Sequence, residues 1–213
     1  MTAGLAFFAR FVLVSSLVFW VWGSVSGHYL ATLVPAVNGA YAACGLPVTL
    51  DLRGGDLVFL YDRLGGGVLK LQALGHESVY LNLVAAISLL AATANRSLRW
   101  MAGWMGLAAA LLWLTHVGSF FAAGQIAVWE YAGSLGPAER AALINDVGLL
   151  LPYERSLWLQ RGLELWNVWS RYAVGTGLWF LAVATSRPEA ARAAAPARTR
   201  PRLGLAPARA AAR

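Results

Sequence analysis

Residues 101–124 read MAGWMGLAAALLWLTHVGSFFAAG, a stretch that contains no aspartate, glutamate, lysine or arginine. A helix needs roughly 20 such residues to cross the hydrocarbon core of a bilayer. Three further stretches are nearly as apolar, at 6–27, 78–94 and 166–186. The sequence therefore predicts an all-α polytopic membrane protein with four transmembrane helices.

The composition of the chain points to the same class. Of its 213 residues, 59% are apolar and 13% are charged, and the mean hydropathy is +0.58. A soluble domain is typically about 45–50% apolar and about 25% charged. These values argue against an ordinary soluble enzyme and against a disordered chain, which needs low hydrophobicity. One cysteine cannot form an internal disulfide framework.

The positive charge indicates how the chain is oriented. Arg10 lies in the first turns of the first span, Arg96 and Arg99 lie in the short link at 95–100, and the segment 186–213 follows the last span. Arginine collects on the cytoplasmic side of membrane proteins. We therefore expect a bacterial cytoplasmic (inner) membrane protein with both termini in the cytoplasm. The last segment is predicted to be a disordered basic tail at the membrane surface, and its arginines are Arg187, Arg192, Arg198, Arg200, Arg202, Arg209 and Arg213.

The connections 28–77 and 125–165 are then extracytoplasmic. Apolar residues at helical spacing over 30–44 predict a helix that continues from the first span. From 48 to 74 the period changes to two and glycine pairs interrupt it, which predicts a small β-hairpin or three-stranded meander. Helices are predicted over 137–165, with the part from 153 onward joined to the last span as one long helix.

The first span has an alternative interpretation. A positively charged start followed by an apolar run is also typical of a signal peptide. The run is long and rich in tryptophan, which favours an uncleaved anchor.

Three residues are candidates for a catalytic site. His116 is predicted to lie inside the third span, where a polar group is costly and often functional. His76 and Glu77 lie where the chain re-enters the membrane, and a carboxylate can orient a neighbouring imidazole and raise its basicity. Two of them also have a structural interpretation. His116 could be a buried histidine with one hydrogen-bond partner, and Glu77 could be a carboxylate in the first turn of a helix, where negative charge is favoured.

Other kinds of site are not expected. His28 and His116 differ in predicted depth by roughly 12 Å, which does not suit a haem with two histidine ligands. Cys44 falls on the apolar stripe of the 30–44 helix, so a buried structural cysteine is predicted rather than a nucleophile. No cofactor and no metal are predicted, and the basic charge belongs to the tail rather than to a nucleic-acid-binding face.

The order of features resembles the core of the exosortase/archaeosortase superfamily over roughly residues 36–125. A helix ends in Ala-Ala-Cys-Gly-Leu-Pro-Val (42–48) and is followed by Thr-Leu-Asp-Leu-Arg-Gly-Gly-Asp-Leu-Val-Phe (49–59). A span then begins through Leu-Gly-His-Glu-Ser-Val (74–79), and Asn-Arg-Ser-Leu-Arg-Trp (95–100) links it to the next. The resemblance implies a multi-pass membrane scaffold connected with envelope protein sorting.

The catalytic residues of that superfamily are not matched. Its members carry Ala-Cys-Ser-Gly where this chain has Leu74-Gly75-His76-Glu77, and an Asn-x-x-Arg where this chain has Thr115-His116-Val117-Gly118-Ser119. The resemblance therefore implies the scaffold, or a role beside a sorting enzyme, and not the chemistry.

Three functions follow from these observations. The first is a non-catalytic accessory or assembly subunit of a bacterial inner-membrane complex that contacts the bilayer and another membrane protein, with exosortase-like envelope sorting as the named system. The second is a membrane enzyme with an outer-face site built from His76, Glu77 and His116. The third is a structural subunit of an energy-transducing complex that contacts pigment, haem or quinone. The balance leans toward a protein that is not an enzyme.

Overall fold

The computed structural model describes the backbone of residues 3–53, 56–62, 68–74, 77–94, 96–147, 153–169 and 173–185. Side chains are described over the same ranges except at residues 3, 62–80, 146–147, 153–154, 156 and 167–168. The chain is mostly helical with one small antiparallel sheet. The elements in chain order are α1 (Ala3–Ala43), β1 (Val48–Arg53), β2 (Asp56–Asp62), β3 (Val68–Leu74), α2 (Glu77–Ala92), α3 (Leu98–Ser134), α4 (Pro137–Val147), α5 (Tyr153–Trp169) and α6 (Gly175–Thr185).

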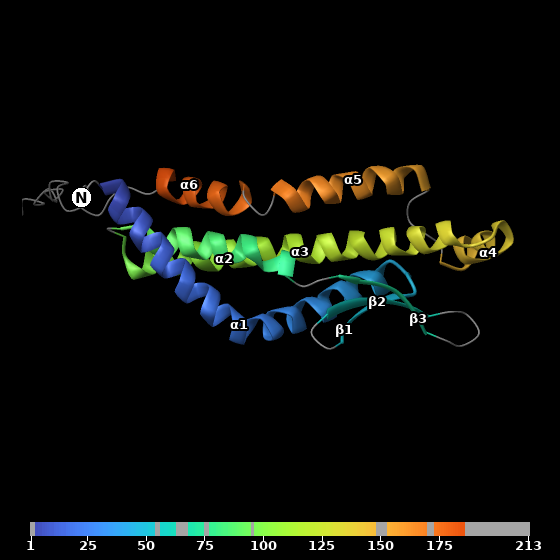
Figure 1. Ribbon diagram of the computed structural model, residues 1–213. Coiled ribbons are helices and arrows are strands. Elements are labelled where there is room, and N and C mark those ends of the chain that lie inside the picture. The colour runs from blue at the N-terminus through green and yellow to red at the C-terminus, as the bar shows by residue number, and fades with distance from the viewer. Residues whose placement is uncertain are drawn as a thin grey trace, which may run out of the picture.

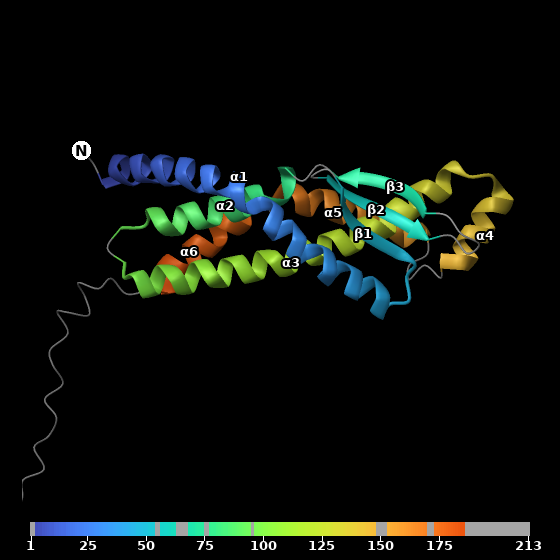
Figure 2. The ribbon, with the colours of Figure 1, turned by 90° about the horizontal axis from the view of Figure 1, so that it is seen from below.

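The long helix α3 runs through the whole molecule, and the other elements gather around its two ends (Figure 1). The start of α1, together with α2 and α6, surrounds the first part of α3. The end of α1, the sheet and α5 surround the second part, with α4 at the far tip (Figures 1 and 2). We call the described residues of 3–27, 77–115 and 173–185 the helical half, and those of 28–74 and 116–169 the sheet half.

Helix α2 is the centre of the helical half, because it packs against α1, α3 and α6. The approach of α6 is close: a Cβ added to Gly175 would lie 3.1 Å from the backbone nitrogen of Ala86 in α2. Small residues that bring two backbones together are typical of helix pairs in membranes. The indole of Trp179 also donates to the hydroxyl of Thr93 at 2.8 Å, which fixes α6 to the end of α2.

The surface of the helical half is apolar. Among the residues that the structure describes, two helices are long and apolar enough to cross a membrane. In α1 none of the most apolar 18-residue stretch is buried, and in α3 only 22% of it is buried. A core helix of a soluble protein would bury most of such a stretch. The large exposed apolar side chains of this half come from all four helices: Leu5, Phe8, Val12, Leu13, Leu17, Phe19, Trp20, Val21, Val25, Leu81, Leu98, Leu107, Leu111, Leu114, Phe180 and Leu181.

The sheet half is built around a dense core. Its strands pair in the order β1-β2-β3, with Val48 opposite Tyr61 and Leu57 opposite Leu74. Tyr41 of α1 is fully buried in this core, and its hydroxyl donates to the Phe120 carbonyl of α3 at 2.7 Å.

Gly124 of α3 leaves the space that Tyr41 fills. A Cβ at this position would meet the Tyr41 hydroxyl and lie 2.8 Å from its Cζ, so only glycine allows α1 and α3 to approach here. The position thus fixes how the two long helices cross in the sheet half.

The predicted meander over 48–74 is confirmed, and its strands begin and end within one residue of the predicted runs. The predicted helix over 30–44 is the end of α1, which continues through Pro35 to Ala43. Four apolar residues of its predicted stripe, namely Leu30, Leu33, Val37 and Tyr41, are buried.

The predicted spans differ from the helices in length. Helix α3 does not end near 124 but continues to Ser134, whereas α2 has 16 residues and α6 has 11. The predicted single helix from 153 to 186 is two helices, α5 and α6, and residues 170–172 between them are outside the described residues.

Candidate functional site

His116 lies where the two halves meet, and it contacts α1. Its Nδ1 is 2.5 Å from the hydroxyl of Tyr29, and the two rings are perpendicular with centroids 5.9 Å apart. Tyr29 in turn packs edge-on against Trp22 at 5.3 Å. Tyr29 packs against the cores of both halves, so the His–Tyr pair joins α1 to α3 at their boundary.

The second ring nitrogen of His116 is buried. The histidine is 5% exposed, and its Nε2 has no hydrogen-bond partner among the described residues. If the Tyr29 hydroxyl donates to Nδ1, then Nε2 carries the proton of the neutral ring. The bond to Tyr29 therefore decides which tautomer of His116 is present. It also gives Nδ1, the ring nitrogen that faces α1, a hydrogen-bond partner.

A second polar link lies near this pair. The indole of Trp113 donates to the Thr32 hydroxyl at 3.0 Å, and that hydroxyl donates to the Tyr29 carbonyl at 2.7 Å. Thr32 lies about one helical turn after Tyr29 on α1, and Trp113 lies about one turn before His116 on α3. These bonds therefore add a second contact to the crossing of α1 and α3.

His76 and Glu77 are the two residues predicted to form a site with His116. His76 lies outside the described residues, and Glu77 is described only as the first backbone position of α2. Figure 1 shows α2 beginning beside the middle of α3. Whether the three side chains converge stays a prediction. The seven arginines of the tail also lie outside the described residues.

The prediction for Cys44 is wrong, because this cysteine is exposed. Helix α1 ends at Ala43, and Gly45 then adopts a left-handed conformation with φ of 67°. The Leu46 nitrogen donates to the Tyr41 carbonyl at 3.0 Å and closes this turn. Such a glycine cap turns the chain away from the helix axis, and the apolar stripe therefore stops at Tyr41.

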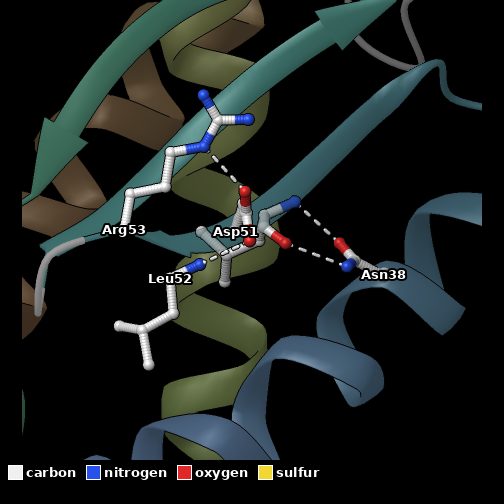
Figure 3. A network of polar contacts seen from close by, with 5 residues as sticks. Asn38, Asp51, Leu52 and Arg53 are labelled. Carbon is white, nitrogen blue, oxygen red and sulfur yellow. Dashed lines mark hydrogen bonds and ion pairs between the residues drawn. The ribbon is translucent and has the colours of Figure 1, made fainter.

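Asn38 provides a link between α1 and the sheet (Figure 3). Its Nδ2 donates to the Leu50 carbonyl at 2.9 Å, and the Leu50 nitrogen donates to its Oδ1 at 2.7 Å. The side-chain amide thus makes the pair of bonds that a neighbouring strand would make with β1. An unpaired strand edge invites association with other chains, and Asn38 closes this position of the edge.

An ion pair lies beside Asn38 on the exposed side of β1. Arg53 Nε lies 2.8 Å from Asp51 Oδ2 (Figure 3). The hydrogen bond from Arg53 holds the pKa of the Asp51 carboxyl below its ordinary value of 3.8. Both side chains are about half exposed, so solvent screens the pair strongly.

An apolar groove separates α3 from α5. It has a volume of about 400 Å³ and is lined from α3 by Thr115, Gly118 and Ser119 and from α5 by Trp158, Leu159, Gly162, Leu163 and Trp166. His116 does not line it, because that side chain points to α1. The groove and the His–Tyr pair are therefore on different faces of α3.

Metal chemistry has no candidate in the part of the chain that the structure describes. No group of three or more histidine, cysteine, aspartate or glutamate side chains there could hold a metal ion.

The sequence analysis did not identify the hydrogen bonds of three residues that hold this region together. These residues are Tyr29, Asn38 and Tyr41. Each is a polar side chain in an otherwise apolar helix, and this is the signal that could have found them. Comparison of the chain with protein-family models, with curated proteins and with solved structures found no match.

Proposed function

We propose that this chain is a four-span protein of the bacterial cytoplasmic membrane, with its sheet half outside and both termini in the cytoplasm. We further propose that it acts as a non-catalytic assembly subunit of a membrane complex. One observation carries the proposal: the helical half exposes apolar side chains on all four of its helices, whereas in the sheet half α1, α3 and the sheet bury theirs in a dense core and the exposed large apolar side chains that the structure describes lie on α5.

The exposed surface supports the four spans. Burying apolar area is worth about 25 cal/mol per Å², so a surface of this kind needs a cover, and lipid tails provide one. Helices α2 and α6 are short, but they pack beside α1 and α3. Leu81 of α2 and Phe180 of α6 are exposed in the same way as the residues of α1.

The arginines support the orientation. The start of α1, the link between α2 and α3 and the end of α6 lie at one end of the molecule (Figures 1 and 2). Arg10, Arg96 and Arg99 belong to that end, and arginines close to span ends favour the cytoplasm. The sheet and α4 lie at the opposite end.

The surroundings of His116 support a structural role. A catalytic base must reach the proton that it abstracts, whereas this imidazole is buried and bonded to Tyr29. The resemblance to the exosortase/archaeosortase superfamily adds the system. The chain keeps the order of features but lacks the cysteine and the arginine, which suits a subunit that works beside a sorting enzyme.

Purification from native membranes in mild detergent, with mass spectrometry of what remains bound, tests the proposal. We expect a stoichiometric partner that is itself a multi-pass protein and carries the cysteine and the arginine of a sorting enzyme. A photocrosslinking residue at Ala141, which is exposed on α4 at the outer end, should label that partner. The matched position Leu13, exposed on α1, should label lipid instead.

One result would overturn the assembly role. If the protein is recovered alone and has an activity that His116→Ala abolishes while the fold persists, the enzyme interpretation with His76, Glu77 and His116 replaces it.

A further inference from the structure

The groove between α3 and α5 has a mostly apolar lining, and both hydroxyl groups in it donate their protons to carbonyls of α3. Thr115 donates its hydroxyl to the Leu112 carbonyl, and Ser119 donates to the Thr115 carbonyl, each at 2.8 Å. The remaining wall consists of tryptophan, leucine and glycine. A ligand for this groove must therefore be apolar along its length.

Two glycines open the groove. A Cβ added to Gly118 or to Gly162 would meet nothing within 4 Å. A second hollow of about 290 Å³ shares Gly162 and Trp166 and extends to Leu165 and Trp169. The two hollows thus adjoin along the surface of α5, and both are open to the surroundings.

The level of the groove along α3 matches a membrane boundary. Gly118 is about 30 Å from Leu98 at 1.5 Å per residue, and the hydrocarbon core of a bilayer is also about 30 Å thick. Trp158, Trp166 and Trp169 of α5 flank this level, and indoles prefer the interface.

A positive charge lies at the same place. The Arg161 guanidinium stacks over the ring of Trp158, 5.6 Å from its centroid. Arginine presents several donors to the oxygens of a phosphate. The apolar groove with a guanidinium beside it is complementary to a molecule with an acyl chain and a phosphate.

We propose that this groove holds one acyl chain of a phospholipid from the outer leaflet, with the lipid phosphate at Arg161. The proposal rests on the membrane insertion proposed above. A helix about 10 Å wide would fill the 400 Å³ of the groove with roughly one turn, so a thin chain suits the space better than a partner helix.

Filling the groove tests the proposal. Gly162→Leu and Gly118→Leu each place a side chain in the open space and improve helix propensity. The matched control is Gly103→Leu, which also lies in open space on α3 but does not line the groove. Native mass spectrometry after stepwise detergent washing counts the phospholipid molecules that each purified protein retains.

We expect the wild type and Gly103→Leu to retain one phospholipid after the bulk lipid is removed, and both groove variants to lose it. Arg161→Gln should lose it at an earlier washing step than the wild type. The proposal would be overturned if lipid retention were equal in the wild type, Gly103→Leu, Gly118→Leu and Gly162→Leu. Groove variants that keep the lipid but lose a protein partner would also overturn it, and they would assign the groove to that partner.

A failure of membrane insertion is recognised separately. Wild-type protein that alkaline carbonate releases from membranes would overturn the four-span proposal, and the lipid proposal with it. Wild-type protein that resists carbonate but retains no phospholipid would overturn the lipid proposal alone.

Discussion

The two halves of this molecule differ in where their apolar side chains lie. Among the side chains that the structure describes, ten of the largest fully buried ones lie in the sheet half, and two, Leu90 and Leu112, lie in the helical half. The sheet half has a core like that of a water-soluble domain, in which side chains from α1, α3 and the sheet cover one another. The helical half is four helices wide, and 16 large apolar side chains are exposed among its described residues. In the sheet half, the large apolar side chains that are exposed among the described residues all lie on α5. Exposed apolar side chains are therefore spread over four helices in one half and confined to one helix in the other.

The largest expected effect tests the core of the sheet half. Tyr41→Ala removes a fully buried aromatic ring and its bond to the Phe120 carbonyl. We expect the free energy of unfolding to fall by about 3–5 kcal/mol. Thermal unfolding of the detergent-purified protein measures the loss. Tyr41→Phe is the control and should lose only about 1 kcal/mol; equal losses would mean that the ring is not part of a tight core.

The next effect tests the helical half. Leu17 is 56% exposed, and Leu17→Arg should disfavour insertion by about 2.5–3.5 kcal/mol at the centre of a span. Thr49→Arg, at an exposed position of β1, should change stability by less than about 0.5 kcal/mol. The insertion of glycosylation-tagged protein into microsomes measures the first, and thermal unfolding measures the second. If Leu17→Arg leaves the insertion into microsomes unchanged, water and not lipid covers α1.

A smaller effect tests the link between α1 and the sheet. Asn38→Ala leaves the nitrogen and the carbonyl of Leu50 without their side-chain partner. We expect a loss of about 1–3 kcal/mol, and faster hydrogen exchange of the Leu50 amide. Asn38→Asp keeps the acceptor for that amide and should protect it better than alanine does. Unchanged exchange in both variants would contradict the bonds drawn in Figure 3.

The smallest effect concerns pH. The pKa of Asp51 is lowered by Arg53, so the pair stabilises the fold above the ordinary pKa of 3.8 and loses this contribution as pH falls through the lowered value. An exposed pair is worth less than about 1 kcal/mol. The midpoint of thermal unfolding of Asp51→Asn should lie slightly below that of the wild type at pH 7 and match it near pH 2. A difference that grows at low pH would reverse the sign.

Local patterns made the sheet half predictable in part. The alternation in Val48, Leu50 and Leu52 and the stripe from Leu30 to Tyr41 depend only on neighbours in the sequence, and both appear in the structure. The partner of His116 did not follow from any local pattern, because Tyr29 is 87 residues away. The exposure of Cys44 depends on the left-handed turn at Gly45.

The length of helices was harder to predict than their existence. Hydropathy marks where lipid can cover a helix, but α1 and α3 continue beyond that limit because the sheet half covers their ends. The packing of α6 on α2 depends on the close approach of Gly175 to Ala86, a contact between segments far apart in the chain.

The bonds between Asn38 and Leu50 also bear on the order in which the protein folds. The two residues are 12 apart in the sequence, and two residues separate β1 from β2. These contacts close small loops, so we expect them to form early. The Tyr41 contact with Phe120 spans 79 residues and must wait for α3. We therefore expect Asn38 to hold β1 on α1 before α3 has been synthesised, when the open edge of this strand would be most exposed to other chains.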